Sequence, residues 1–430
     1  MLLVGACGGG QGIRGDAGVD RGSGGGSSGD ARGSGGSGGS TGMAGDAGTT
    51  PDADAKDALD GGGGATDGGA GDGDVSTGAD DGGGSDVHLC HNPPPAPATA
   101  VTDQVTFLAG VVTTTVTGSG TYGDQDGAMA TVALRDPVSV IIEPAGTLLV
   151  CDQDNNKIKR VDPASGNAST LTAQAGFLRP FGFAYGNGKL YVDTDFNASG
   201  AKSNLTGTIW TIDVMSGAAT VVMQNLGRPR GLAALPDGRL VLGDYQNQRV
   251  RLLDPAAKVV SDLAGEQGCP GSDDGAGMAA HFATPYGVVV LPDGKSIIVA
   301  DYDNHALRAI TLAGVVSTFA GVSTQKGTVD GPRLSARFQT PQSLAIDAAG
   351  DIFVTDPTAH RIRRVAADGT VTTVAGDGMG GFKDGAGMAS QFFGEEGIDV
   401  SRDGKTLYVA DGTWGQDQPY NRIRRIVITP

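Results

Sequence analysis

A repeated unit of about 43 to 56 residues constrains the fold of this chain more than any other feature. In most units a short apolar strand is followed by a turn and by a second apolar strand that ends in Asp, and three units begin at a Pro-x-Gly sequence. Two further strands complete the unit, and turns of this kind join neighbouring strands into one antiparallel sheet. A period of this length is typical of β-propellers and excludes most helical solenoids. The six units begin near Pro137, Pro180, Pro229, Pro285, Pro341 and Glu396.

The two ends of the repeat array complement each other. The sixth unit stops after three strands, and residues 104–110 at the start of the array resemble the fourth strand at residues 316–321. A ring of sheets buries faces that a single sheet exposes, and a borrowed strand leaves no open edge. We therefore predict an all-β fold. Residues 104–430 form a six-bladed β-propeller of four-stranded antiparallel blades, closed by the N-terminal strand, which completes the last blade.

One pattern carries a family resemblance. Several units share Val-Ala-Asp-x-x-Asn-x-Arg-Ile-Arg-Arg-Val around the second and third strands, and Val-Thr-Thr-Val-Ala-Gly on the fourth. Over residues 104–430 the chain resembles the NHL-repeat family, which implies a propeller and no particular function. The second unit departs from this pattern, because Thr194 replaces the Asp and an insertion over residues 196–206 follows.

Composition separates a tether from the repeats. Residues 1–100 hold 32 of the 74 glycines, 14 Asp, no Glu, four Arg or Lys, and no aromatic residue other than His. So few apolar groups cannot offset the entropy of ordering the backbone. We predict a disordered Gly/Asp/Ser-rich linker over residues 8–103.

The first seven residues resemble the lipobox of bacterial lipoproteins, with small residues before Cys7. The resemblance implies a lipid on Cys7, although the six preceding residues are fewer than a signal peptide needs. We interpret residues 1–7 as a truncated lipoprotein-like signal. The expected location is the cell envelope, either lipid-anchored to the outer membrane or secreted, with the membrane contacted only through that lipid.

The remaining cysteines match no metal or redox motif. Cys90 and Cys269 lie in loop-like sequence and are a candidate disulfide pair in an oxidising compartment. Cys151 follows an apolar run and takes the place of Ala300 and Ala410 in later units, so we interpret it as a buried small residue.

An Asp closes the second strand in five units. Its carboxylate can accept backbone N–H bonds from the following turn, and repetition favours this structural role over catalysis. The residues four positions further on complete the turn. The structural aspartates are Asp152, Asp244, Asp301, Asp356 and Asp411.

Few residues indicate chemistry. His305 and His360 occupy equivalent places in adjacent units and are weak metal candidates, because some NHL-like propeller lyases bind zinc through histidines of separate blades. A third ligand is not evident, so we assign no metal site, no catalytic residue and no cofactor. Basic residues on the third strands alternate with apolar ones, which indicates a solvated face or pairing with carboxylates. The acidic net charge argues against a nucleic-acid partner.

Four connecting loops share an Asp-Gly sequence, and we interpret the Asp of each as a helix N-cap. These loops emerge on one face of the expected ring, which is our preferred binding surface. We expect a monomeric, non-enzymatic module that binds a protein or glycan there or at the axis. The alternative is a propeller hydrolase or lyase, lactonase-like or amide-lyase-like, with a metal at the central channel. The loop aspartates are Asp126, Asp274, Asp330 and Asp384.

Overall fold

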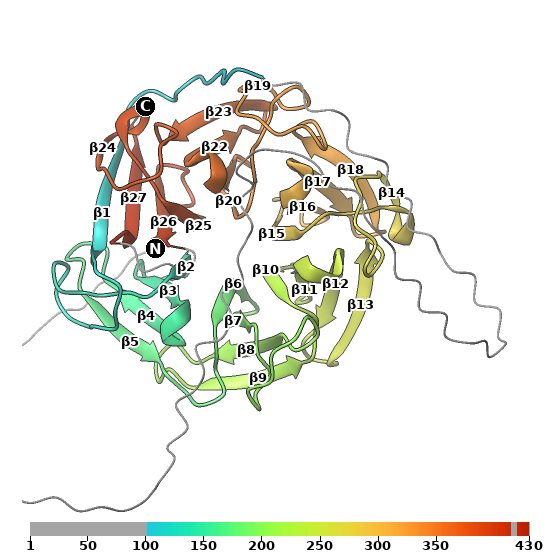
Figure 1. Ribbon diagram of the computed structural model, residues 1–430. Helices are drawn as coiled ribbons and strands as arrows, with labels where there is room; N and C mark the ends of the chain where they lie inside the picture. The colour runs from blue at the N-terminus through green and yellow to red at the C-terminus, as the bar shows by residue number, and fades with distance from the viewer. Residues whose placement is uncertain (1–100, 414–418, 430) are drawn as a thin grey trace, which may run out of the picture. The chain divides into compact units, whose positions relative to one another are not determined.

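The computed structural model describes residues 101–413 and 419–429. The lipoprotein-like signal over 1–7, nearly all of the linker over 8–103, Cys7 and Cys90 lie outside these residues. Within the described part, six antiparallel sheets surround a common axis (Figure 1), and the predicted six-bladed propeller is confirmed.

Each blade has four main strands, numbered outward from the axis. Blade 1 holds β2 (Pro137–Ile142), β3 (Leu148–Asp152), β4 (Lys157–Val161) and β5 (Ala168–Thr172). Blade 2 holds β6 (Pro180–Gly186), β7 (Lys189–Thr194), β8 (Thr208–Ile212) and β9 (Ala219–Gln224). Blade 3 holds β10 (Pro229–Ala234), β11 (Leu240–Asp244), β12 (Arg249–Asp254) and β13 (Val259–Ala264).

The next two blades carry an additional two-residue strand on the outer edge. Blade 4 holds β15 (Pro285–Val290), β16 (Ser296–Asp301), β17 (Ala306–Thr311) and β18 (Val315–Ala320), with β14 (Gly275–Ala276) outside β18. Blade 5 holds β20 (Leu344–Ile346), β21 (Ile352–Asp356), β22 (Arg361–Val365) and β23 (Thr370–Ala375), with β19 (Gly331–Pro332) outside β23.

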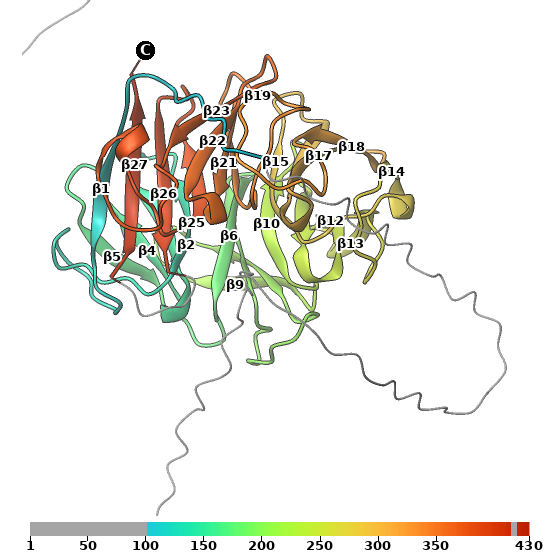
Figure 2. The same ribbon diagram turned by 45° about the horizontal axis from the view of Figure 1, so that its top comes forward.

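The sixth blade joins the two ends of the domain. It holds β25 (Gly394–Val400), β26 (Thr406–Gly412) and β27 (Asn421–Ile428), followed outward by β1 (Val111–Gly120) and β24 (Gly385–Ala386). β1 pairs antiparallel with β27 from Val111 opposite Ile428 to Gly120 opposite Asn421. The N-terminal strand therefore closes the ring, as predicted, and Figure 2 shows it beside β27.

The position of the closing strand differs from the prediction. Residues 104–110, which were expected to close the ring, instead run along the outer edge of blade 5, where Phe107 bridges Thr373. The Thr106 amide donates to Asp330 at 2.6 Å. β1, which follows these residues, is the strand that corresponds to the fourth strands of the other blades. Its Thr115 amide donates to the loop residue Asp384, just as the Thr318 amide of β18 donates to the loop Asp of blade 4. We call residues 101–110 the strap.

In blades 1, 3, 4 and 5 the turn after the second strand is a short 3-10 helix that ends in a left-handed residue. In blade 4 this residue is His305, with φ 57°, and in blade 5 it is His360, with φ 50°. Two more 3-10 helices follow β14 and β24. The six are η1 (Gln153–Asn155), η2 (Tyr245–Asn247), η3 (Gly277–Ala279), η4 (Tyr302–Asn304), η5 (Pro357–Ala359) and η6 (Gly387–Ala389). None of the helices in the described ranges is long and apolar enough to cross a membrane.

The core is divided into six apolar clusters, one between each pair of neighbouring blades. The cluster between blades 6 and 1 joins Val116 of β1 to Val150 and Val161 of blade 1. Burial of apolar area between the faces of adjacent sheets is the main stabilising term of such a ring. Closure by β1 therefore completes a packing interface as well as a hydrogen-bonded edge.

Glycine in the Pro-x-Gly sequence allows the inner strands to approach each other around the axis. A Cβ on Gly287 would lie 2.6 Å from the carbonyl oxygen of Gln342 in the next blade, and the Gly287 amide donates to that oxygen at 2.9 Å. A Cβ on Gly231 would lie 2.1 Å from the Tyr286 carbonyl oxygen. Any larger side chain would push neighbouring blades apart at the axis.

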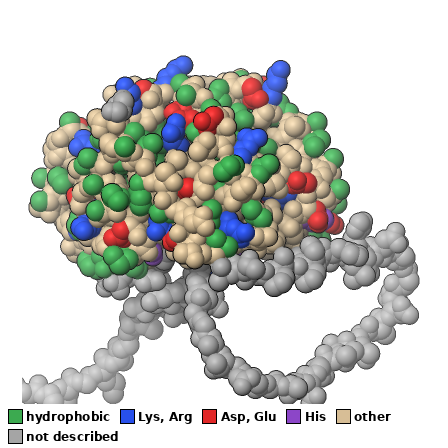
Figure 3. Space-filling model, turned by 90° about the horizontal axis from the view of Figure 1, so that it is seen from above, with side chains coloured by type: hydrophobic (Ala, Val, Ile, Leu, Met, Phe, Trp, Pro, Cys, Tyr) green, Lys and Arg blue, Asp and Glu red, His purple; other side chains and the backbone are tan. Residues whose placement is uncertain are grey.

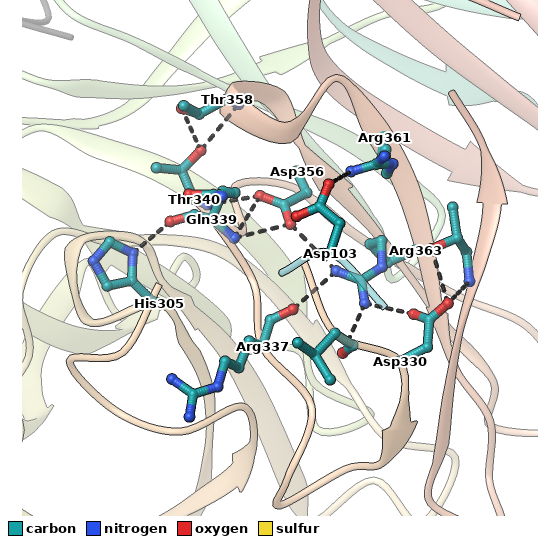
Figure 4. Close-up of polar contacts among 12 residues, drawn as sticks. Asp103, His305, Asp330, Arg337, Gln339, Thr340, Asp356, Thr358, Arg361 and Arg363 are labelled. Atoms are coloured by element: carbon teal, nitrogen blue, oxygen red, sulfur yellow. Dashed lines mark hydrogen bonds and ion pairs between the residues drawn. The ribbon is translucent and has the colours of Figure 1, made fainter. Parts of the chain in front are cut away.

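A buried ionic network repeats in blades 4, 5 and 6. In blade 5 the Arg363 guanidinium contacts Asp356 at 3.5 Å and Asp330 at 2.5 Å, and donates to two loop carbonyls (Figure 4). It lies 5.1 Å from the centre of the Phe338 ring. Arg308 and Arg424 make equivalent contacts and are fully buried. The interpretation of the third-strand basic residues as a solvated face is wrong for these side chains, and pairing with carboxylates is the arrangement found.

Two other details of the network correct the sequence interpretation. Asp356 accepts the backbone amides of Gln339 and Thr340, which precede the first strand of its blade, and not those of the following turn. The loop aspartates are not N-caps, since the residue before η3 is Ala276 and no side chain caps it. Asp274 instead accepts from the Thr318 amide and from Arg308. The second-strand carboxylates therefore fix each blade to the loop that leads into it.

Blade 2 replaces this ion pair with a neutral pair. Thr194 stands where the other blades have Asp, and Trp210 stands at the register position of Arg308. The Trp210 indole N–H donates to the Thr194 hydroxyl at 2.9 Å, and both residues are buried. The sequence departure in this blade is thus a paired substitution.

Candidate functional site: an arginine cluster at the axis

One residue near the start of the first strand of each blade lies at the axis of the ring, and in blades 2, 3 and 4 it is the x of a Pro-x-Gly sequence. These six side chains differ from blade to blade, although all are buried and the surrounding backbone repeats. Differences at repeated positions are where a function can be placed on a symmetric scaffold. We call this set the axial ring, and its members are Val138, Phe181, Arg230, Tyr286, Gln342 and Glu396.

Strand direction places the axial ring near the loop face. The innermost strand of each blade starts after the long connection from the preceding blade, and the 3-10 turns follow the end of the second strand at the same level. The axial ring, the 3-10 turns and the long connections therefore share one face of the propeller. This is the face that the sequence analysis preferred for binding.

Three arginines on this face surround one carboxylate. The guanidinium of Arg230 lies 3.1 Å from Asp195, that of Arg228 also 3.1 Å, and that of Arg179 3.4 Å. Asp195 is fully buried, and burial alone would raise its pKa, but the three guanidiniums outweigh burial and hold that pKa below its usual value. Arg179 is about one third exposed and also pairs with Asp154. We call Arg179, Asp195, Arg228 and Arg230 the arginine cluster.

Aromatic rings support the cluster. The Arg230 guanidinium lies 4.1 Å from the centre of the Phe181 ring and 5.2 Å from that of Tyr245. Tyr286 lies between Tyr245 and Tyr302, with ring centres 5.3 and 5.8 Å apart. Tyr245 and Tyr302 are half-buried and reach the surface. Stacking on rings fixes the plane of a guanidinium, which leaves its edges for hydrogen bonds.

The pKa values of two other buried acids near the axis are shifted in the opposite direction from that of Asp195. Burial raises the pKa of Glu396 well above its usual value, and its neighbour Asp136 adds to that shift. Glu396 accepts a hydrogen bond from the Gln342 amide at 3.2 Å. Burial likewise raises the pKa of Asp193. Burial therefore shifts the pKa of these two acids in the opposite direction from that of Asp195.

A channel runs along the axis beyond the ring. It has a volume of about 340 Å³, and the inner strands of all six blades line it. Residues at the ends of these strands, such as Tyr185 and Val290, are more exposed than those at their starts. The channel therefore opens toward the Pro-Asp-Gly turns, and Phe181 and Arg230 are among the residues that line it.

The two histidines do not form a metal site with each other. His305 Nδ1 contacts the Gln339 carbonyl oxygen, and His360 Nδ1 lies 4.0 Å from Glu395. Each ring thus faces the loop that leads into the next blade. Burial lowers the pKa of both rings, which favours their neutral form. In the described ranges, no three His, Cys, Asp or Glu side chains come together as a metal ion would require.

Two cysteines, Cys151 and Cys269, lie in the described residues. Cys269 is disulfide-bonded, and its expected partner Cys90 lies outside the described residues, so their pairing stays a prediction. Cys151 is free and buried in the core, as predicted.

A comparison with models of known protein families identifies the family of this chain. The SMP-30/Gluconolactonase/LRE-like region matches residues 122–375, more than half of the chain. The chain belongs to this family. Its curated relatives include NHL repeat-containing protein 2 of Bos taurus, which is 30% identical over 112 residues, covering 26% of this chain and 15% of the relative. The resemblance to NHL-type propellers is therefore confirmed.

A longer match is the chloroplastic protein SUPPRESSOR OF QUENCHING 1 of Arabidopsis thaliana. It is 26% identical over 303 residues, which are 68% of this chain but 26% of the relative. The chain thus spans about a quarter or less of the length of these curated relatives.

Solved structures share the fold at low identity. An auxiliary nutrient binding protein from Bacteroides thetaiotaomicron superposes with a TM-score of 0.59 at 17% identity, over 74% of this chain and 76% of its own. A gluconolactonase from Xanthomonas campestris superposes with a TM-score of 0.50 at 14% identity, over 79% of this chain and 98% of its own.

The sequence analysis did not single out the arginine cluster. The sequence did contain an indication of the cluster, because the residue type near the start of the first strand varies from unit to unit in an otherwise regular repeat. The divergence of blade 2 was a second signal, because Phe181, Arg179 and Asp195 all come from that blade.

Proposed function

We propose that this protein is a binding module that takes a small molecule or glycan at the arginine cluster, on the loop face of the propeller. The observation that carries the proposal is the convergence of three arginines and three tyrosines at the axis, contributed by blades 2, 3 and 4. A site of this kind has polar groups that orient a ligand and aromatic rings that bury its surface. Solved propellers of this fold are described as auxiliary nutrient binding proteins, which supports a binding role.

A metal-dependent hydrolase or lyase is the second candidate, because a gluconolactonase shares the fold. The residues at the axis do not fit a cation. The oxygens of Asp195 face three guanidiniums, and Glu396 faces Gln342 and Arg230. A divalent cation among three arginines would be repelled. We therefore derive no reaction step through a metal.

Two measurements separate these functions. We expect the full chain to bind at least one member of a panel of monosaccharides, sugar acids and oligosaccharides in calorimetric titrations. We expect Tyr302→Ala to weaken that binding about tenfold, as the loss of a stacked ring does, and Lys295→Ala on the turn face to leave it unchanged. Elemental analysis should find no stoichiometric zinc or calcium. Lactone hydrolysis that depends on an added divalent metal would overturn the proposal.

A location in the cell envelope, lipid-anchored or secreted, fits this function. The support is the lipobox-like sequence before Cys7, the Gly/Asp/Ser-rich tether and the bacterial nutrient binding proteins of the same fold. Globomycin treatment of producing cells checks it, since a lipoprotein precursor would accumulate.

A further inference from the structure

We propose that the axial channel is a second binding site, open at the turn face, for a small organic amine with an apolar body and one ammonium group that pairs with Asp399. The turn face is the end of the propeller that carries the Pro-Asp-Gly turns, opposite the loop face. The inference does not rest on the proposed function, because it concerns a different site.

The wall of the channel contains a ring of equivalent apolar side chains. Figure 1 shows the first strand of every blade innermost. Two residues after each member of the axial ring, all six of these strands carry a branched aliphatic or aromatic residue that lines the channel. This level of the channel favours apolar surface on a ligand, since a polar group buried there without a partner is costly. We call this set the channel ring, and its members are Val140, Phe183, Leu232, Val288, Leu344 and Ile398.

Asp399 is the exception in the next layer of the channel. The residue that follows each member of the channel ring also lines the channel. In blade 6 this residue is Asp399, which is partly exposed. A residue that departs from a repeated apolar pattern inside a cavity is a candidate for specific binding. In the other five blades the residue is apolar: Ile141, Ala184, Ala233, Val289 and Ala345.

The carboxylate of Asp399 has backbone donors and no cationic partner among the described residues. It accepts the amide of Ile142 at 2.7 Å and that of Val400 at 2.8 Å. A carboxylate has about four acceptor positions, so some stay open for a ligand. The buried Asp301, by contrast, pairs with Arg308. An ammonium group in the channel would supply Asp399 with the charge that Arg308 supplies to Asp301.

The charged groups of the neighbouring strands are engaged elsewhere. Glu143, which follows β2, pairs with Arg160 at 3.0 Å. Asp347, which follows β20, accepts amides of its own turn. Tyr408 lies opposite Asp399 on β26, and burial raises the pKa of its hydroxyl, which keeps it neutral. Burial is therefore the cause that raises the pKa of Asp399 to about 6, and a cation beside it would lower that pKa again.

The size of the channel and the order of its layers define the ligand. Its volume of about 340 Å³ exceeds the roughly 150 Å³ of an apolar cavity that holds benzene, so a ring or a short chain fits. The channel ring lies one residue deeper than Asp399, so the apolar end enters first and the ammonium stays nearer the mouth. Arg230 lines the channel three residues deeper than Asp399, about 10 Å along the strands, and is paired with Asp195.

The overall charge of the propeller also favours a cation. Residues 101–430 contain 34 acidic and 27 basic residues, so the field of the propeller attracts cations. Figure 3 shows acidic and basic side chains scattered among others on the side of the ring that it draws. The net charge therefore brings an amine to the molecule, and Asp399 with the channel ring determines where it binds.

The test compares three probes that share a six-carbon chain and differ in the terminal group. Hexylamine, 1-hexanol and hexanoate are each titrated into the full chain by calorimetry at pH 8. We expect the amine to bind at least about tenfold more tightly than the alcohol, the difference typical of one charge-assisted hydrogen bond, and hexanoate to bind most weakly. Asp399→Asn should remove the preference for the amine and retain the binding of the alcohol. Asp403→Asn is the matched control, because Asp403 lies on an exposed turn of the same blade and accepts from Ser401 and Lys405 of that turn.

A pH series gives a second readout that needs no substitution. Protonation of Asp399 competes with the amine, so the affinity should be constant above about pH 7 and should fall as the pH drops through 6. At pH 5 about one tenth of a carboxyl group with this pKa is ionised, so hexylamine should bind about tenfold more weakly than at pH 8. The affinity for 1-hexanol should not change. Circular dichroism at each pH and for each variant shows whether the chain is folded.

The remaining outcomes would overturn the inference. Equal affinity for hexylamine and 1-hexanol would remove the ammonium group from the ligand class. An affinity for hexylamine that survives Asp399→Asn, or that is the same at pH 5 and pH 8, would place the amine elsewhere on the protein. No binding of any of the three probes at millimolar concentration would show that the channel is not a site for such molecules. The proposed function at the arginine cluster would be untouched by these results, since its own panel of ligands tests it.

Discussion

At the scale of single residues, blade 2 shows how a buried ion pair can be replaced. Blades 3 to 6 pair a second-strand Asp with an arginine, whereas blade 2 pairs Thr194 with Trp210 through one hydrogen bond. Both partners changed together, which avoids an uncompensated buried charge. The change also accompanies the placement of Asp195, one residue later, among the axial arginines.

The same reasoning predicts the effect of breaking a pair in blade 4. Arg308→Met removes a charged donor from Asp301, Asp274 and two loop carbonyls, because Arg308 contacts both carboxylates and donates to the carbonyls of Asp273 and His281. We expect a loss of about 3–5 kcal/mol in the free energy of unfolding, measured by urea denaturation.

The control for this prediction is the double variant Asp301→Asn, Arg308→Met. It removes the charge on both sides, so its loss should be smaller than the sum of the two single losses. Strict additivity would contradict the view that the pair acts as a unit.

Asp399 gives a prediction with a pH dependence. It lies on the axial channel and accepts the Ile142 amide at 2.7 Å, and burial raises its pKa from 3.8 to about 6. Because the pKa in the folded state is the higher one, folding favours the protonated acid. That stabilisation is complete below pH 4 and is lost as the pH rises through 6.

Asp399→Asn should remove this dependence, since the amide stays neutral. Between pH 4 and pH 7 the stability of the variant should rise relative to the unsubstituted protein by about 2–3 kcal/mol. Urea denaturation at both pH values measures the difference. Parallel stability curves for the two proteins would show that Asp399 titrates normally in the fold.

At the scale of elements, the closing strand and the strap have different roles. β1 supplies a full edge of blade 6 and buries Val116 between blades 6 and 1. The strap contributes half-buried Phe107 and Leu108 and the hydrogen bond from Thr106 to Asp330. Only β1 is required for closure.

Three truncated chains test this division. A chain that starts at residue 111 should fold cooperatively and be about 2 kcal/mol less stable than one that starts at residue 101, from the partial exposure of two apolar side chains. A chain that starts at residue 121 exposes the edge of β27 and should aggregate. Thermal unfolding measures the loss of stability, and size-exclusion chromatography measures the aggregation. Equal stability of the chains that start at residues 111 and 121 would refute the role of β1.

The elements also explain what the sequence could predict. The repeat predicted six sheets and a borrowed strand, because strand pattern and turns are local properties. It misplaced the closing strand, because residues 104–110 contain Thr-Phe and end in Ala-Gly as residues 316–321 do, whereas β1 contains an irregularity between Thr115 and Thr117. The contact that settles the register, Asp384 with Thr115, joins residues 269 positions apart.

The candidate site was hidden for a related reason. The sequence analysis treated x of Pro-x-Gly as a variable residue, and its place at the axis follows only when the first strand of every blade is known to be innermost. Arg230 and Asp195 are 35 positions apart and belong to different blades. Their contact depends on the closeness of blades 2 and 3 that Gly182 permits, since a Cβ there would lie 3.1 Å from the Arg230 carbonyl oxygen.

At the scale of the whole molecule, stability is shared among six similar interfaces between blades. Each apolar cluster joins two neighbouring sheets, so no single blade has a core of its own. Such a ring is expected to unfold as one unit once an interface opens. The acidic tether, with its few apolar residues, should add nothing to these interfaces.

The disulfide of Cys269 is the exception that allows a test of the tether. If Cys90 is its partner, the full chain gains stability from the cross-link that a chain starting at residue 101 lacks. We expect the full chain to be about 2–4 kcal/mol more stable under oxidising conditions. With reductant present the two chains should have the same thermal midpoint, because only the cross-link distinguishes them. A difference that survives reduction would show that the tether itself contacts the propeller, and Cys90→Ser in the full chain should reproduce the reduced behaviour.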